Sequence, residues 1–163
     1  MGQKSRGRGS LGGRCPIDKG NRLGYFEYQE SFQLREPKMF EVKIQVEFSA
    51  AHNLREVGGK CESLHGHNFK VEVAVESERL DDQGMVIDFR FLKEKTRNLL
   101  DRLDHKYLNE LSFFRGQNPS SETIAAYLFG ELSRIVDLES RRVSWVAVWE
   151  SDTSRALFRR SAP

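Results

Sequence analysis

The sequence predicts an α+β fold, in which a four-stranded antiparallel sheet carries two helices on one face. Three observations predict it: apolar and polar residues alternate over 42–50 and again over 69–76, two helical patterns follow, and two further strand patterns close the chain. The expected order of elements is therefore strand, strand, helix, helix, strand, strand. With 163 residues, the chain has the length of one ordinary domain.

The first two strand patterns have opposite parity. Between 42 and 50 the apolar residues fall on even numbers, and between 69 and 75 they fall on odd numbers, with polar residues such as Glu72 turned outward. A period of two is typical of a half-buried strand. Because a loop of about a dozen residues joins the two, we expect an antiparallel pair in which the end of the first strand lies beside the start of the second.

The middle of the chain predicts two helices. Residues 84–87 indicate a short strand, and Asp88 is suited to cap the helix that follows. That helix would bury Phe89, Leu92, Thr96, Leu99, Leu100 and Leu103. The second helix is expected to begin with Asn118 as its N-cap and Pro119 at its first position. It would bury Ile124, Ala125, Leu128, Phe129, Leu132, Ile135 and Val136. Closing strands are expected at 143–150 and near 155–159.

Composition divides the chain into two parts. Residues 1–24 hold seven of the 13 glycines, interleaved with Arg and Lys and without an apolar period. We therefore expect a flexible basic extension at 1–38 and a folded domain at 39–163. The first 38 residues contain eight of the 26 Lys and Arg and four of the 24 Asp and Glu, which leaves the domain a net charge of −2. A mildly acidic domain argues against a broad nucleic-acid-binding surface.

Cysteine content and hydropathy indicate a cytoplasmic protein. Two cysteines, Cys15 and Cys61, are too few for a disulfide framework. The sequence has no run of about 18 apolar residues, and no apolar segment follows the N-terminal basic residues. Neither a membrane span nor a signal peptide is therefore expected.

Three of the four histidines fall on the inward register of the first two strands. His52 continues the even parity of the first strand, and His65 and His67 share the odd parity of the second. In an antiparallel pair all three converge at one end of one face, with His65 and His67 about 6 to 7 Å apart along their strand. A single inward histidine is usually a packed core residue, but three converging imidazoles suit one Zn²⁺ and leave a fourth position open. We therefore predict a zinc site.

Cys61 lies on the loop just before His65, and two roles are open to it. As a fourth ligand it would close a structural zinc site, and the domain would be a non-catalytic zinc-binding interaction module. As a free thiolate beside the ion it would be a base or a nucleophile. The spacing alone does not decide between these alternatives.

Further polar residues could complete a catalytic site. His105 follows Asp104 at the end of the first helix, where it could interact with the helix dipole or, oriented by Asp104, relay a proton. Glu150 ends the third strand, either as a solvated charge or as an acceptor of two parallel hydrogen bonds from a pterin or guanine edge. The second helix opens with Ser120, Ser121 and Glu122. These are ordinary first-turn residues, although the N–H groups there could also hold a polar ligand.

Taken together, six segments resemble the 6-pyruvoyl-tetrahydropterin synthase family. They are residues 48–52 (FSAAH), 61–67 (CESLHGH), 88–89 (DF), 103–105 (LDH), 118–122 (NPSSE) and 149–150 (WE). The similarity covers about residues 39–160, and the C-x-x-x-H-G-H spacing most resembles the bacterial branch, the 6-carboxy-tetrahydropterin synthases of queuosine biosynthesis. A branch linked to folate synthesis has glutamate at the cysteine position, and Cys61 argues against that branch.

The resemblance implies the tunnelling fold, with trimers stacked into homohexamers and active sites at subunit interfaces. It implies zinc at the three histidines, proton abstraction by Cys61, a relay at Asp104 and His105, and a pterin anchor at Glu150. It also argues against the closed zinc site. The implied reaction converts 7,8-dihydroneopterin triphosphate to 6-carboxy-5,6,7,8-tetrahydropterin and releases acetaldehyde and triphosphate. In the pyruvoyl-forming branch the side chain is retained instead.

Overall fold

The computed structural model describes residues 39–161. The expectations for residues 1–38, including Cys15, lie outside this range. Four strands form one antiparallel sheet in the order β1-β2-β3-β4. They are β1 (Phe40–His52), β2 (His65–Ser77), β3 (Arg141–Ser151) and β4 (Ser154–Arg159).

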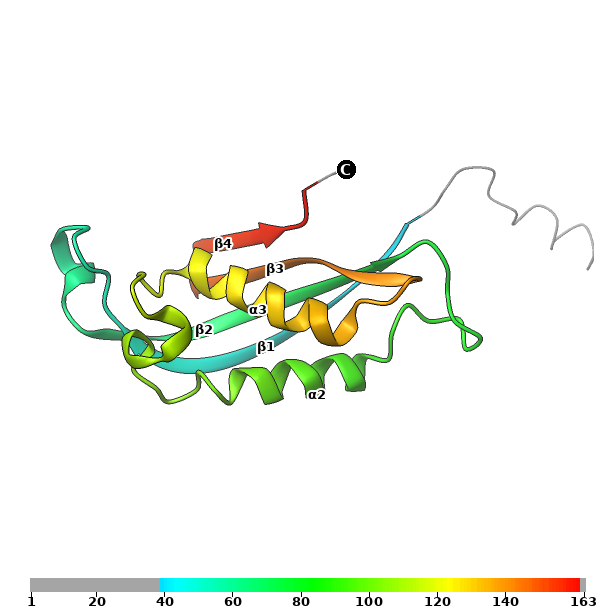
Figure 1. Cartoon of the computed structure of the whole chain (residues 1–163), viewed down its shortest axis with the longest axis horizontal. Coiled ribbons are helices and arrows are strands. Elements are labelled where there is room, and N and C mark those ends of the chain that lie inside the picture. The colour runs from blue at the N-terminus through cyan, green and yellow to red at the C-terminus, as the bar shows by residue number, and fades with distance from the viewer. Residues whose placement is uncertain (1–38, 162–163) are drawn as a thin grey trace, which may run out of the picture. The chain divides into compact units, whose positions relative to one another are not determined.

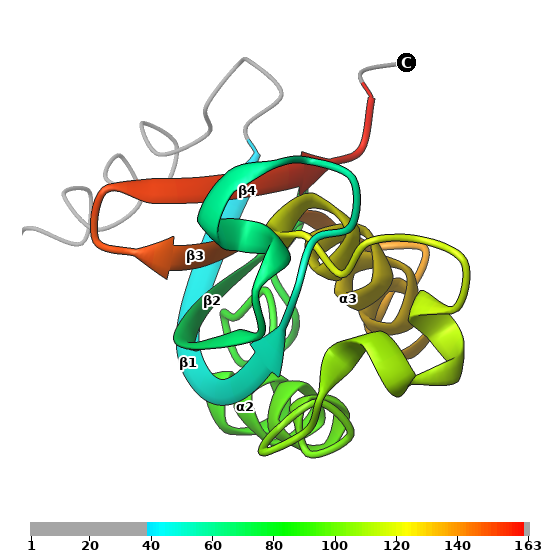
Figure 2. The same cartoon turned by 90° about the vertical axis from the view of Figure 1, so that its left-hand side faces the viewer.

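Two helices lie between β2 and β3 in the sequence, α2 (Phe89–Leu100) and α3 (Ser121–Val136). Both cover the same face of the sheet (Figure 1, Figure 2), and α2 packs beneath β1 while α3 packs beneath β3 and β4. The predicted architecture and the predicted order of elements are confirmed.

The pairing of β1 with β2 sets the geometry of the site. Each strand has 13 residues, and the register runs without a break from Phe40 opposite Ser77 to His52 opposite His65. Residues 53–64, here called the Cys61 loop, therefore leave and re-enter the sheet at adjacent backbone positions. Figure 1 shows this loop projecting beyond the end of the sheet.

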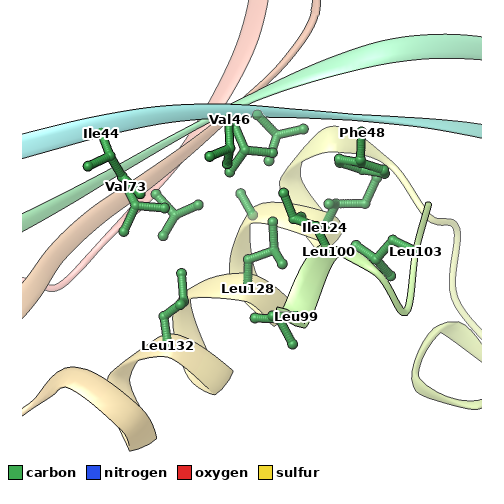
Figure 3. Packing of buried hydrophobic residues seen from close by; sticks show 14 of the residues in the cluster. Ile44, Val46, Phe48, Val73, Leu99, Leu100, Leu103, Ile124, Leu128 and Leu132 are labelled. Carbon is green, nitrogen blue, oxygen red and sulfur yellow. The ribbon is translucent and has the colours of Figure 1, made fainter. Parts of the chain in front are cut away.

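The hydrophobic core fills the space between the sheet and the helices. Figure 3 shows its centre, formed by Ile44, Val46, Phe48, Val73, Leu99, Leu100, Leu103, Ile124, Leu128 and Leu132. None of these side chains is more than 7% exposed. Burial of one such side chain contributes about 1.5 to 3 kcal/mol. The inward face of β1 is therefore fixed along most of its length, up to the residues that precede His52.

Residues 84–87 form no strand, although a short strand or strand extension was expected: a turn at 81–84 leads into irregular chain. The Asp81 carboxylate accepts hydrogen bonds from the backbone N–H groups of Gln83 and Met85, both at 2.9 Å. Gly84 closes the turn with a φ of 78°, in the left-handed region that glycine tolerates. Local hydrogen bonding to a side chain has replaced sheet pairing here.

Both helices bury most of the predicted stripe. Phe129 is only partly buried, and Leu103 is buried but lies beyond the end of α2. Phe89 is 50% exposed and Ile135 is 44% exposed. Phe89 is the first residue of α2 and Ile135 is the second-last residue of α3, so both lie where the helix leaves the core.

The start of α3 differs from the prediction by two residues. Its N-cap is Ser120, whose hydroxyl accepts a hydrogen bond from the N–H of Thr123. Asn118 and Pro119 therefore precede the helix. The Asn118 side chain bonds to the backbone of Arg55 instead of capping α3.

Glu72 lies on the helix-free face as predicted, but it is only 6% exposed. Lys43 Nζ donates to its carboxylate at 2.6 Å and Trp149 Nε1 at 3.1 Å, with Arg155 at 3.6 Å. Burial raises the pKa of Glu72, but the hydrogen bonds from Lys43 and Trp149 outweigh it and hold the pKa below its ordinary value. Lys43 on β1, together with the neighbours on β3 and β4, accounts for this buried charge.

Candidate metal centre and active site

Three imidazoles meet where β1 ends and β2 begins. The ring centroids of His52, His65 and His67 are 4.6, 4.9 and 5.2 Å apart, and each ring offers a nitrogen within 4.8 Å of the others. The register produces this arrangement, because His52 pairs with His65 and His67 lies two residues further along the same face. The ring of Phe69 packs edge-on against His52 and His67. The three histidines converge as predicted.

Backbone carbonyls orient two of the rings. His52 Nδ1 lies 2.8 Å from the carbonyl oxygen of Pro119, and His65 Nδ1 lies 2.7 Å from that of Ser63. A carbonyl can only accept, so each Nδ1 carries the proton and each Nε2 has a free lone pair.

The free nitrogens fit a metal ion. Within residues 39–161, the Nε2 atoms of His52 and His67 are buried and have no hydrogen-bond partner. A buried polar atom without a partner is costly, and a metal ion would satisfy both atoms at once. Three neutral nitrogen ligands without a carboxylate are a donor set that suits Zn²⁺.

The electrostatics of His52 favour its metal-binding form. Burial lowers the pKa of His52, and the charges of His65 and His67 lower it further. The Pro119 carbonyl and the Glu150 carboxylate act in the opposite direction without reversing the shift. The neutral imidazole, which is the form that binds a metal, is therefore favoured.

Cys61 lies on an exposed 3₁₀ turn, Gly59–Glu62, within the loop that joins His52 to His65. Among the described residues, the group of atoms placed to share an ion contains the three imidazoles and does not contain this thiol. The arrangement therefore favours a free thiol and an open coordination position over a closed four-ligand site.

Asp104 and His105 lie on a segment that follows α2 and runs beside the outer edge of β1. Helix α2 ends at Leu100, so His105 is outside the last turn, where a helix dipole would act. His105 Nδ1 is 2.8 Å from one carboxylate oxygen of Asp104. The other oxygen of Asp104 accepts the N–H of Ser49 at 2.8 Å, and His105 N–H donates to the Ser49 carbonyl at 2.6 Å. The edge of β1 thus holds both residues of the predicted pair in place.

The surroundings of Asp104 keep it ionised. The hydrogen bond from Ser49 N–H lowers the pKa of Asp104, burial opposes this effect, and His105 lowers the pKa further. The His105 side chain is 81% exposed and lines a hollow together with His67. Cys61 is not among the described residues that line this hollow. One chain therefore brings His105 beside a metal ligand without placing it in the same hollow as the thiol.

Glu150 lines a second cleft, formed by the end of β3, the start of α3 and β4. The lining residues are Leu54, Ser120, Ser121, Glu122, Glu150, Ser154, Arg155 and Ala156. Glu150 is also close enough to His52 for its charge to raise the pKa of that ring. The four residues expected to bind ligand thus share one cleft near the metal centre.

Two asparagines without a predicted site role contact the Cys61 loop. Asn109 bonds to the backbone of Asn53, and Asn118 bonds to the backbone of Arg55. Asn118 is the first residue of the segment 118–122 noted in the sequence, and Asn109 lies four residues after the segment 103–105. Their position in or near these segments was the only signal in the sequence that could have indicated a role. Their hydrogen-bond partners are backbone atoms, which a pattern of residue types does not identify.

Comparisons with known proteins place this site in a family. Residues 41–161 match the family described as 6-pyruvoyl tetrahydropterin synthase. The chain belongs to this family. A 6-carboxy-5,6,7,8-tetrahydropterin synthase of Synechocystis sp. is 41% identical over 127 residues, which cover 74% of this chain and 93% of that protein. The protein of the same name from Bacillus subtilis is 30% identical over 134 residues, with coverages of 78% and 90%.

Solved structures agree with this assignment. The Caenorhabditis elegans 6-pyruvoyl tetrahydropterin synthase matches with a TM-score of 0.68 and 27% identity, over 78% of this chain and all of that one (100%). The tunnelling fold expected from the sequence is therefore confirmed for this chain. No helix in the described part of the chain is long and apolar enough to cross a membrane.

Proposed function

We propose that this chain is a zinc-dependent 6-carboxy-5,6,7,8-tetrahydropterin synthase. It would convert 7,8-dihydroneopterin triphosphate and one molecule of water to 6-carboxy-5,6,7,8-tetrahydropterin, acetaldehyde and triphosphate, as a cytoplasmic step of queuosine biosynthesis. The observation that carries the proposal is a three-imidazole cluster with two unpartnered buried nitrogens near a cleft that contains Glu150. The names of the relatives from Synechocystis sp. and Bacillus subtilis support the choice of product.

His52, His65 and His67 would hold the zinc ion. When bound, zinc supplies Lewis-acid chemistry: it polarises substrate oxygens and stabilises the negative charge that develops on them. The protein's contribution is to present neutral imidazoles, since the carbonyls of Pro119 and Ser63 orient His52 and His65 with Nε2 free.

The cleft beside the metal centre would bind the pterin. The Glu150 carboxylate can accept two parallel hydrogen bonds, one from a ring N–H and one from the exocyclic amino group. Ser120, Ser121 and Glu122 line the same cleft at the start of α3, where the first N–H groups of a helix have no acceptor within the helix. Glu150 is close enough to His52 for its charge to raise the pKa of that ring, which supports a pterin site next to the three histidines.

Proton transfer would use Cys61 and His105. The thiolate removes a proton from the substrate side chain, and His105, held by Asp104, carries protons to and from the reacting atoms. Both residues are exposed, and the hollow that His105 lines does not include the thiol. We therefore propose that His105 of one copy serves Cys61 of another, in a homohexamer built as a dimer of trimers with active sites at its interfaces.

The direct test is incubation of the zinc-loaded protein with 7,8-dihydroneopterin triphosphate, followed by assays for acetaldehyde and for the mass of the pterin product. We expect equal amounts of acetaldehyde and 6-carboxy-5,6,7,8-tetrahydropterin. A pterin that keeps its three-carbon side chain, without acetaldehyde, would assign the chain to the 6-pyruvoyl-tetrahydropterin synthase activity instead. This alternative is tested because the similar C. elegans structure is named as a 6-pyruvoyl tetrahydropterin synthase. Formation of neither product would contradict both activities.

A further inference from the structure

The base of the Cys61 loop is held by side-chain amides instead of a neighbouring strand. Asn109 Oδ1 accepts the N–H of Asn53 at 3.0 Å, and Asn109 Nδ2 donates to the Asn53 carbonyl at 2.9 Å. Asn118 makes the same pair of bonds with Arg55, at 2.8 and 3.0 Å. Each asparagine thus satisfies both backbone groups of one residue, as the peptide groups of a paired strand would.

These contacts complete a series along the outer edge of β1. The N–H groups of the alternate residues 49, 51, 53 and 55 all donate to the segment 104–118. In that order the acceptors are Asp104 Oδ1, Lys106 O, Asn109 Oδ1 and Asn118 Oδ1. The segment that orients His105 at one end of the series therefore holds the Cys61 loop at the other end.

Further hydrogen bonds connect this base to the thiol-bearing turn. Asn53 accepts the Tyr107 hydroxyl at 2.5 Å and donates through Nδ2 to the Glu62 carbonyl at 3.3 Å. Leu54, between the two residues that the asparagines hold, donates its N–H to the Cys61 carbonyl at 2.8 Å. A shift of the loop base would therefore shift the backbone of Cys61.

The residue that follows the segment 104–118 contacts the proposed metal centre. Pro119, the neighbour of Asn118, accepts the His52 ring N–H at 2.8 Å. Adjacent residues thus fix a metal ligand and the loop that follows it. The rest of the loop has little packing to hold it in place, since residues 55–64 are all exposed.

We propose that Asn109 and Asn118 are positioning residues that hold the Cys61 thiol in place relative to the three-histidine centre. Neither touches the reacting groups, since both act through the backbone of the loop base. An amide is needed because each residue must accept one hydrogen bond and donate another, and an ionised carboxylate can only accept. The inference rests on the proposed function, in which Cys61 is the base.

The test compares Asn118→Asp and Asn109→Asp with Asn98→Asp, a control at an exposed position on α2. Substitution of Asp for Asn conserves the shape of the side chain and removes one hydrogen-bond donor. In Asn109→Asp and in Asn118→Asp we expect kcat to fall by about tenfold to a hundredfold, with zinc content and the KM for the pterin within about twofold of wild type. The Asn98→Asp variant should keep wild-type kcat. Hydrogen–deuterium exchange of the Leu54 amide, followed by NMR, should be about tenfold faster in Asn109→Asp and Asn118→Asp, but not in Asn98→Asp.

The possible outcomes separate the inference from the proposed function. Wild-type kcat in both Asn109→Asp and Asn118→Asp would overturn the inference. Loss of zinc together with kcat would also overturn it, since the asparagines would then serve the metal centre. Tyr107→Phe removes only the bond to Asn53 and should shift kcat and Leu54 exchange in the same direction, so it replaces any variant that does not fold. If the wild-type chain does not turn over the pterin, the proposed function fails, and Leu54 exchange alone shows whether the asparagines hold the loop.

Discussion

The residues proposed to bind the metal and the residues proposed to move protons are held in opposite ways. The three histidines stand on two strands paired along their whole lengths, and His52 is 0% exposed. Cys61 and His105 stand on irregular segments, and the His105 side chain is 81% exposed. The three imidazoles converge within one chain, whereas the groups proposed to transfer protons depend on loop contacts and, in our proposal, on a second copy. Substitutions in the two regions should therefore differ in kind.

The largest effect is expected from a change within the buried metal centre. Replacing His52 with Ala removes a ligand, leaves the Pro119 carbonyl without its donor and creates a cavity, so we expect loss of zinc and of all measurable turnover. The free energy of unfolding should fall by about 2 to 4 kcal/mol. Metal analysis measures the zinc content, and denaturant titration measures the free energy of unfolding. Retention of one zinc per chain would show that the ion binds elsewhere.

A change in the exposed region should separate turnover from zinc binding. The variant Cys61→Ala should keep its zinc, with unfolding free energy within about 0.5 kcal/mol of wild type, while kcat falls by about a thousandfold or more. Val57→Ala, at an exposed position on the same loop, serves as the control and should keep its activity. Loss of zinc and stability in Cys61→Ala would instead support the closed four-ligand site and a non-catalytic module.

A smaller effect is expected in the cleft between the two regions. Glu150→Gln keeps the shape of the side chain but loses the charge and one acceptor, so we expect kcat/KM for the pterin to fall by about a hundredfold. Zinc content should not change. A wild-type kcat/KM would show that the pterin is anchored by another residue.

The smallest effect concerns the pH dependence of the metal-free protein. Since the pKa of His52 lies below its ordinary value of 6.5, the unfolded chain binds a proton more readily than the folded chain below pH 6.5. Stability of the chelator-treated protein should therefore be full above this pH and decline as the pH falls towards the folded pKa. The carboxylates of Glu72 and Asp104, whose pKa values are also lowered, act at still lower pH, below their ordinary values of 4.5 and 3.8. Thermal unfolding at a series of pH values measures the decline, and a flat profile would contradict the shift at His52.

The same contrast explains what the sequence could predict. The convergence of the histidines followed from a period of two on each strand, because register transmits parity across a pair. The roles of Asn109 and Asn118 were not predictable, because their partners are backbone groups of a loop. Asn118 was assigned as a helix cap because its residue type suits that position, but Ser120 suits it equally and stands closer to the helix. The burial of Glu72 depends on Trp149 and Arg155, which lie on strands distant in the sequence.

The measurement that tests this account most directly is complementation between two inactive variants. Cys61→Ala and His105→Ala would each be assayed alone and after co-expression, with the wild-type protein as the reference. If the metal centre belongs to one chain and His105 comes from another, random assembly of the two variants gives complete pairs at about a quarter of the sites. We predict recovery of about a quarter of wild-type turnover. An active wild-type protein without any recovery in the mixture would contradict the account, because Cys61 and His105 would then act within one chain.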